Sequence, residues 1–316
     1  MPRVPGAAFT SRIGLPGNSE SCYRCANRPI SRPLQSAFVI LSGGHSSDYP
    51  IAKISTSIIA FNQADKIGEA VASVLWTDEI VLADSHSSDG TAEIAERLGA
   101  RVVQIPITTF SELRNRAADA CTHEWILSLD SDERCTPAVR DEILALLAEG
   151  PKYDAYYIPR RNYFMGRWIK GSGWYPNYRQ PQFYRKGTML YTRIIHEAVV
   201  MQSGQPIGKF ENAILQFPFQ NFEEVLAKAN RYSTFGARML AHKRVSMWSA
   251  LGHALWAFIK HYVFKLGFRD GWAGFVIAFG NFEGTFYRYA KRYEEMKAWQ
   301  RLTVEPLRRT DRTARK

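Results

Sequence analysis

Two carboxylates separated by one residue, Asp130 and Asp132, directly follow an apolar run at residues 125–129. The run predicts a buried strand, so the acidic pair stands where that strand ends. In an open parallel sheet, ligands bind beyond the carboxyl ends of the strands. Two adjacent carboxylates repel each other unless a cation lies between them, and such a pair suits a hard divalent ion that takes its other ligands from phosphates and water. The alternative is a solvated turn that caps the next helix.

Two further predicted strands also end in polar side chains. Residues 54–61 predict a first strand, followed by Asn62, and residues 79–83 predict a second, followed by Asp84. Because parallel strands end at the same edge of a sheet, these side chains and the acidic pair are expected on one rim. Their convergence favours a ligand-binding site over three unrelated polar strand ends.

The elements that would position this rim alternate between strand and helix at a spacing of roughly 20–30 residues, which is typical of a parallel sheet. Asp65 and Ser111 are predicted to cap two of the helices, and Pro137 to occupy the first position of another. The predicted fold class is therefore α/β, with a doubly wound, mostly parallel sheet flanked by helices and a C-terminal helical extension.

Composition restricts the class of partner. The 316 residues carry a formal charge of +11, which favours an anionic partner such as a nucleotide, a phosphorylated lipid, a membrane surface or a nucleic acid. The cysteines are Cys22, Cys25, Cys121 and Cys135. Cys22 and Cys25 have metal-site spacing, but no second Cys/His pair stands at a suitable distance, so the sequence predicts a reduced, cytoplasmic chain without a zinc site.

The two ends of the chain are expected to lie outside the folded enzyme. Residues 1–50 are rich in Ser, Pro, Gly and Arg and are predicted to form a disordered extension, without the ordered regions of a signal peptide. Residues 300–316 are predicted to form a disordered basic tail. No stretch is long and apolar enough to predict a spanning helix.

Two regions between these ends suggest surfaces for large ligands. Residues 160–187 mix aromatic, glycine and arginine residues, so that rings could stack on sugars and guanidinium groups could bind phosphates, although an irregular surface is the simpler alternative. Residues 221–299 predict aromatic helices with interspersed basic residues. Such helices lie in a membrane interface or simply pack onto the sheet.

Three stretches resemble family 2 glycosyltransferases, namely residues 58–62, residues 81–91 and residues 127–134. The resemblance extends over about residues 53–295. Within the family, the chain resembles the lipopolysaccharide core β-glucosyltransferase branch, through residues 157–162, 173–176, 195–197 and 230–233. It implies a GT-A nucleotide-sugar transferase domain at 51–220 and a membrane-associating helical extension at 221–299.

The resemblance also implies roles for single residues. Asp84 matches the acid that reads a uracil ring, Asp130 and Asp132 match a metal-binding pair with Asp132 favoured as the direct ligand, and Glu197 matches the position of the general base. The full set of implied donor-binding residues is Phe61, Asn62, Asp84, Arg114, Asn115, Asp130 and Ser131. The implied acceptor-binding residues are Arg160, Arg161, Trp174 and His196, with His196 also a possible metal or phosphate ligand.

The chain departs from the family pattern at two positions. Gln63 stands where a glutamate is common, and His86 where a glycine is usual. A residue with a Cβ at the second position must adopt a left-handed conformation that glycine adopts at no cost, which leaves the base preference of the nucleotide loop open.

The sequence thus predicts an inverting, Mg²⁺- or Mn²⁺-dependent transferase at the inner face of the cytoplasmic membrane. It would move a hexose, expected to be glucose from UDP-glucose, onto a lipid-linked oligosaccharide. Polyprenyl phosphate is the alternative acceptor, but that variant commonly carries spanning helices. A nucleotidyltransferase and a dinucleotide oxidoreductase would each need a glycine-rich turn after the first strand, which is absent. A nucleic-acid-binding protein is disfavoured because much of the excess charge lies in the two ends.

Overall fold

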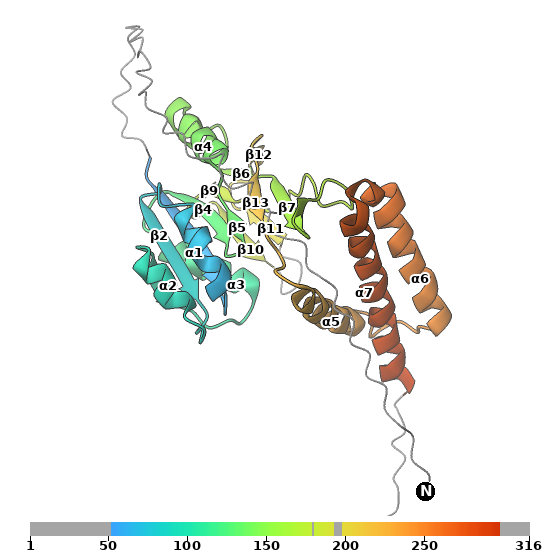
Figure 1. The fold of residues 1–316 in the computed structure, drawn as a ribbon. Coiled ribbons are helices and arrows are strands. Elements are labelled where there is room, and N and C mark those ends of the chain that lie inside the picture. The colour runs from blue at the N-terminus through green and yellow to red at the C-terminus, as the bar shows by residue number, and fades with distance from the viewer. Residues whose placement is uncertain (1–51, 179, 193–197, 298–316) are drawn as a thin grey trace, which may run out of the picture. The chain divides into compact units, whose positions relative to one another are not determined.

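The computed structural model describes residues 52–178, 180–192 and 198–297. The predicted N-terminal extension and basic tail, together with Cys22, Cys25, His196 and Glu197, lie outside these residues. Figure 1 shows the arrangement of the described elements.

A seven-stranded sheet forms the centre of the fold, in the order β12-β6-β9-β4-β1-β2-β3. β1, β2, β3 and β4 are parallel to one another, whereas β9 runs antiparallel to both β4 and β6. The sheet is therefore mixed but mostly parallel, as predicted. Its strands are β1 (Ile54–Ala60), β2 (Glu79–Asp84), β3 (Arg101–Gln104), β4 (Trp125–Asp130), β6 (Ala155–Tyr157), β9 (Phe183–Arg185) and β12 (Gly208–Lys209).

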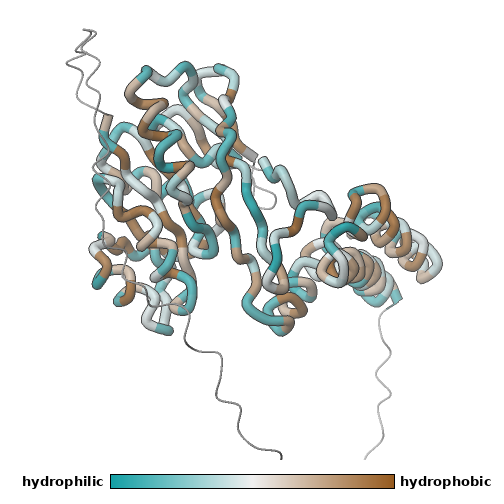
Figure 2. Tube along the Cα trace, turned by 45° about the horizontal axis from the view of Figure 1, so that its top comes forward, coloured by the Kyte–Doolittle hydropathy of each residue, from teal (hydrophilic) through white to brown (hydrophobic). Residues whose placement is uncertain are grey.

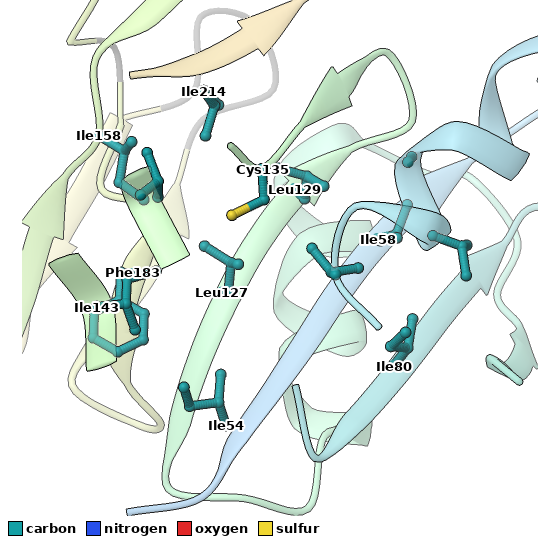
Figure 3. Close-up of a cluster of buried hydrophobic side chains, with 14 of the residues drawn as sticks. Ile54, Ile58, Ile80, Leu127, Leu129, Cys135, Ile143, Ile158, Phe183 and Ile214 are labelled. Carbon is teal, nitrogen blue, oxygen red and sulfur yellow. The ribbon is translucent and has the colours of Figure 1, made fainter. Parts of the chain in front are cut away.

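Helices cover both faces of this sheet because its central strands are apolar on both faces. One face packs against α1 (Ala64–Ala72), α2 (Thr91–Arg97) and α4 (Pro137–Glu149). The other packs against α3 (Phe110–Ala120) and a hairpin of β10 (Met189–Thr192) and β11 (Ala198–Met201). Figure 3 shows the first of these cores, in which Ile58 of β1 and Leu127 and Leu129 of β4 are fully buried.

The start of α1 is capped in a different way from the one predicted. Asp65 lies in the first turn, and the residue at the cap position, Gln63, makes no side-chain cap. Instead, the Asp89 carboxylate accepts the backbone N–H of Ala64 at 3.0 Å, and the Thr91 hydroxyl accepts that of Gln63 at 2.8 Å. Side chains at residues 89 and 91 thus accept backbone N–H groups at the start of α1.

The predicted cap of α3 is also wrong. Thr109 is the cap residue, and its hydroxyl accepts the backbone N–H of Glu112. Ser111 instead donates to the Thr192 carbonyl at 3.2 Å, which joins α3 to β10. Pro137 does stand at the first position of α4, behind a Thr136 cap.

A second, four-stranded sheet continues from the end of β4, in the order β5-β13-β7-β8. Its strands are β5 (Glu133–Arg134), β13 (Ile214–Gln216), β7 (Arg160–Phe164) and β8 (Arg167–Trp168). Part of the region predicted as irregular therefore forms a small sheet. Its first strand begins directly after Asp132.

The C-terminal region is helical, as expected. It contains α5 (Phe222–Met239), α6 (Met247–Ile259), a π-helical turn η1 (Lys260–Phe264), a 3₁₀ turn η2 (Gly267–Asp270) and α7 (Gly271–Lys297). α6 and α7 lie side by side (Figure 1). Phe164 and Ile169 pack against Ala273 and Ile277 of α7, which fixes the helices to the second sheet. Among the described residues, no helix is both long and apolar enough to cross a membrane.

Candidate active site

The strand register brings the predicted polar strand ends together. Ala60 of β1 lies opposite Asp84 of β2, and Ile59 lies opposite Asp130 of β4. Asn62, Asp84 and the acidic pair therefore share the rim at the carboxyl ends of the central strands, where ligands of parallel sheets bind. Phe61, also on this rim, is half-exposed.

The loop after β2 is held by its own carboxylate. Asp84 is fully buried, and its two oxygens accept the Ser87 hydroxyl and, at 3.0 Å, the Ser87 backbone N–H. Asn62 joins this loop through its amide oxygen, which accepts the Ser88 N–H at 2.9 Å. His86 adopts the predicted left-handed conformation, with φ at 60°.

Beside Asp84, the Ser85 hydroxyl is buried and has no hydrogen-bond partner among the described residues. Sequence reasoning missed this residue, because a serine after a strand carries no distinctive signal. Buried polar groups are normally paired, so an unpaired hydroxyl at a ligand-binding rim is available to a bound molecule.

Asp130 is neutralised by a cation. A guanidinium nitrogen of Arg114 lies 2.7 Å from its carboxylate. Burial would raise the pKa of Asp130, but the positive charges of Arg114 and then Arg160 outweigh burial and lower it. Asp130 is therefore ionised and already has a protein partner.

Asp132 has the opposite environment. Burial and then the negative charge of Asp130 raise its pKa, while the Gln216 side-chain amide and the positive charges of Lys228 and Lys66 offset part of this effect. The Gln216 nitrogen lies 3.3 and 3.4 Å from its two oxygens. No guanidinium or ammonium group pairs with Asp132 among the described residues, so this carboxylate is the one that a bound cation would stabilise most.

Glu133 stabilises the acidic turn that contains Asp130 and Asp132. It is fully buried, forms an ion pair with Arg160, and accepts the Asp130 backbone N–H and the Gln182 amide, both at 2.9 Å. Burial raises the pKa of Glu133 to about 7, and the Arg160 charge opposes that rise. Arg160, predicted to bind the acceptor, is thus buried with its charge balanced by Glu133.

Arg134 connects the turn at residues 130–133 to α1 through hydrogen bonds. Its guanidinium group donates to the carbonyl oxygens of Ser131 and Glu133 at 2.9 and 2.8 Å, and to that of Lys66 at 2.9 Å. It also lies 3.1 Å from the Glu69 carboxylate. Ser131 is therefore held through its backbone, which fixes the two aspartates on either side.

The remaining predicted site residues are Asn115, Arg161 and Trp174, which the structure describes, and His196 and Glu197, which it does not. Asn115 exchanges two hydrogen bonds of 2.9 Å with the backbone of Tyr191 in β10, so α3 links the acidic strand to the hairpin. Arg161 stacks 4.9 Å from the Trp168 ring centroid, and Trp174 packs against Phe164. His196 and Glu197, between β10 and β11, lie outside the described residues.

Sequence comparisons relate the chain to known glycosyltransferases. The sequence model described as glycosyl transferase family 2 matches residues 55–203. An uncharacterized glycosyltransferase of Rickettsia felis is 30% identical over 267 residues, which cover 77% of this chain and 90% of that protein. The lipopolysaccharide core biosynthesis glycosyltransferase LpsC of Rhizobium meliloti is 27% identical over 81% of this chain and 97% of its own.

Among solved structures, S. aureus TarS residues 1–349 align with a TM-score of 0.43 at 14% identity, over 78% of this chain and 91% of that one. A glucosyl-3-phosphoglycerate synthase from Mycobacterium tuberculosis, solved with Mn²⁺ and UDP, gives 0.32 at 23% identity, and the match spans 38% of this chain and 51% of that one.

The chain belongs to glycosyl transferase family 2, and its mostly parallel sheet with flanking helices is the GT-A fold. It is a glycosyltransferase, as the sequence motifs predicted.

Proposed function

We propose that this chain is an inverting hexosyltransferase that moves glucose from UDP-glucose onto a lipid-linked oligosaccharide such as a lipopolysaccharide core. The observation that carries the proposal is the placement of Asp132 at the end of β4, with a raised pKa and no cationic partner among the described residues. Such a carboxylate suits a site where a metal and a diphosphate bind together.

The residues present fit a divalent cation, Mg²⁺ or Mn²⁺. Asp132 is the direct ligand in this proposal, and Asp130, already paired with Arg114, is the weaker one. No group of three metal-ligating side chains occurs within the described residues, so the donor diphosphate and water would complete the coordination. When bound, the cation neutralises the charge that develops on the leaving diphosphate.

The other rim residues bind the donor in this proposal. Phe61 offers an exposed ring, and Asn62 and Asp84 shape the loop that meets the nucleobase. Arg114 contributes positive charge near the phosphates, and Asn115 and Ser131 hold the neighbouring backbone. Ser85 supplies an additional hydroxyl toward the base.

Glu197 is proposed as the general base. It would take the proton from the acceptor hydroxyl while that oxygen attacks the sugar carbon on the face opposite the diphosphate, which inverts the anomeric centre. The basis is its family-like position, because the residue lies outside the described part of the chain. His196, Arg161 and Trp174 are proposed on the acceptor side.

A lipid-linked acceptor is supported by two independent observations. The LpsC relative is named for lipopolysaccharide core biosynthesis. The second is the set of exposed large apolar side chains on the C-terminal helices, along which hydrophobic and hydrophilic segments are interspersed (Figure 2). They include Trp248, Trp256, Ile259, Val263, Phe264, Leu266, Phe268, Trp272 and Phe279. We propose that these helices lie peripherally on the inner face of the cytoplasmic membrane, and that the basic residues at 300–316 add attraction to anionic lipid.

The test is a donor and acceptor screen with the purified full-length chain. UDP-glucose, UDP-galactose and GDP-mannose are supplied with core oligosaccharide lipid or polyprenyl phosphate, and the anomeric configuration of the product is read by NMR. We expect transfer from UDP-glucose to the core lipid with inversion. Transfer only to polyprenyl phosphate, or retention of configuration, would overturn the proposal.

A further inference from the structure

A cavity lies between the segment around β8 and the η1–η2 turns. Its volume is about 510 Å³, which is within the usual range for a small-molecule site. The lining residues are Arg167, Trp168, Lys170, Gly171, Gly173, Tyr175, Phe264, Lys265, Leu266, Arg269 and Asp270. None of them belongs to the carboxylate rim.

The walls of this cavity are built by specific backbone contacts. The Asp270 carboxylate accepts the N–H groups of Lys170 and Gly171 at 3.1 and 2.7 Å, and the Lys265 carbonyl accepts that of Ser172 at 2.7 Å. A Cβ added at Gly171 would lie 2.4 Å from the Leu266 backbone carbonyl oxygen. The two segments therefore approach closely, and glycine is needed for the fit.

The lining is strongly cationic. Arg167, Lys170, Lys265 and Arg269 contribute four positive charges, and within the described residues none of them forms an ion pair. The one lining carboxylate, Asp270, is buried and occupied by backbone N–H groups. Four cations and one carboxylate leave the lining with a formal net charge of +3 (4 − 1), which favours an anion, and arginine forks are well matched to phosphate.

An unpaired donor lies in the same wall. The Trp168 indole N–H is buried and has no acceptor among the described residues. Its ring is covered by the Lys170 ammonium group, 4.6 Å from the centroid. Unpaired buried donors are uncommon in folded proteins.

The edge of the cavity is apolar and exposed. Phe264 and Leu266 line the cavity and are 66% and 42% exposed, and Phe268 and Trp272 continue the same surface at 49% and 77%. An anion site bordered by exposed aromatic side chains matches the boundary between lipid headgroups and acyl chains.

The second sheet connects this cavity to the acidic turn. Glu133 of β5, directly after Asp132, pairs with Gln216, which pairs with Asn162, and the adjacent Tyr163 pairs with Trp168 of β8. Three steps between strands amount to roughly 14 Å. That span is comparable to a short oligosaccharide.

We propose that this cavity binds a phosphate group carried on the saccharide headgroup of a membrane lipid, and thereby holds a phosphorylated acceptor whose sugar reaches the end of β4. The proposal rests on the proposed function, because it assigns the chemical class of that acceptor. The phosphate, rather than the negative charge of the bilayer as a whole, is the feature recognised.

The experiment measures binding of the full-length chain to phosphatidylcholine vesicles that carry one of three additives. These are a phosphorylated disaccharide glycolipid, the same glycolipid after enzymatic dephosphorylation, and phosphatidylglycerol at equal surface charge. We expect the phosphorylated glycolipid to bind at least about tenfold more tightly than either of the others, and inorganic phosphate to compete only weakly.

The pocket variant is Arg167→Gln with Arg269→Gln, both exposed positions, and the matched control is Lys243→Gln with Arg244→Gln, which removes the same charge from the α5–α6 connection. The pocket variant should lose the preference for the phosphorylated glycolipid over the dephosphorylated glycolipid and phosphatidylglycerol, and the control variant should keep it. Equal binding to phosphatidylglycerol, or a preference that survives in the pocket variant, would overturn the proposal.

Hydrolysis of UDP-glucose without lipid separates this inference from the proposed function. The pocket variant should hydrolyse the donor at the wild-type rate. Wild-type protein that prefers the phosphorylated glycolipid but hydrolyses no nucleotide sugar would refute the proposed function and leave the phosphate site standing.

Discussion

At the scale of single residues, two aspartates one position apart have opposite electrostatic environments. Arg114 and Arg160 lower the pKa of Asp130, whereas burial and the charge of Asp130 raise that of Asp132. Ionised Asp132 is therefore unfavourable for folding until a cation binds. Functional sites often carry strained charges of this kind.

Substitution Asp132→Asn tests this environment. Because the folded-state pKa is raised, the folded protein binds a proton more tightly than the unfolded chain, and stability falls as pH rises from the ordinary aspartate value through the raised one. Without metal, the variant should match wild type below this window and exceed its unfolding free energy above it. Urea unfolding at several pH values measures the difference, and a variant less stable than wild type at neutral pH would contradict the assignment.

The donor loop offers a second prediction at this scale. Asp84→Ala should weaken UDP-sugar binding more than it slows catalysis, because it releases Ser87 from two hydrogen bonds. Ser87→Ala should then also weaken UDP-sugar binding. Ser85→Ala should make the free energy of UDP-sugar binding less favourable by about 0.5–1.5 kcal/mol without altering the loop. Titration calorimetry gives the affinities. Unchanged donor affinity in Asp84→Ala would exclude this loop from the donor site.

At the scale of elements, a buried ion pair joins β5 to β7. Above pH 7, where Glu133 is ionised, Glu133→Gln leaves the Arg160 guanidinium buried without its carboxylate, so we expect a loss of about 3–5 kcal/mol in unfolding free energy. Glu69→Gln is the matched control, because its carboxylate is 79% exposed in its pair with Arg134 and should contribute at most about 1 kcal/mol. Equal losses in the two variants would show that burial does not determine the strength of these pairs.

The strands and helices differ in how well the sequence predicts them. β1, β2, β4 and α4 follow from apolar runs and one proline, because local pattern and burial agree there. The second sheet is not predicted, because its strands are two to five residues long and, apart from the β7–β8 hairpin, pair across large sequence separations. Caps supplied by Asp89 from another loop were missed for the same reason.

The sequence predicts the two aspartates of the site but not the residues that surround them in the fold. Asp130 and Asp132 follow a recognisable strand, whereas two groups that act on their pKa values, Arg160 on Asp130 and Gln216 on Asp132, stand on β7 and β13, further along the chain. Only the tertiary fold brings them together. The burial of Arg160 likewise depends on its pairing with Glu133.

At the scale of the whole molecule, exposed aromatic side chains on α6, η2 and α7 predict reversible membrane association. Trp256→Ser combined with Trp272→Ser should lower affinity for anionic vesicles about tenfold or more, because each indole buries a large apolar area. Leu75→Ser, an exposed apolar residue after α1, is the control. Vesicle sedimentation at low and high salt gives the measurement. Wild-type protein that stays in the supernatant with anionic vesicles at low salt would contradict the account.

The most direct test of the central claim is the initial rate of glucose transfer from UDP-glucose to a core oligosaccharide lipid, with Mn²⁺ or Mg²⁺ and with excess chelator. Wild type should be active with metal and inactive in chelator, Asp132→Asn should lose about 10²-fold or more of the rate with metal, and Glu197→Gln should lose about 10²–10⁴-fold while it keeps its affinity for UDP-glucose. Full transfer by the wild type in excess chelator, or an Asp132→Asn variant as fast as wild type, would contradict a metal-dependent transferase centred on the end of β4.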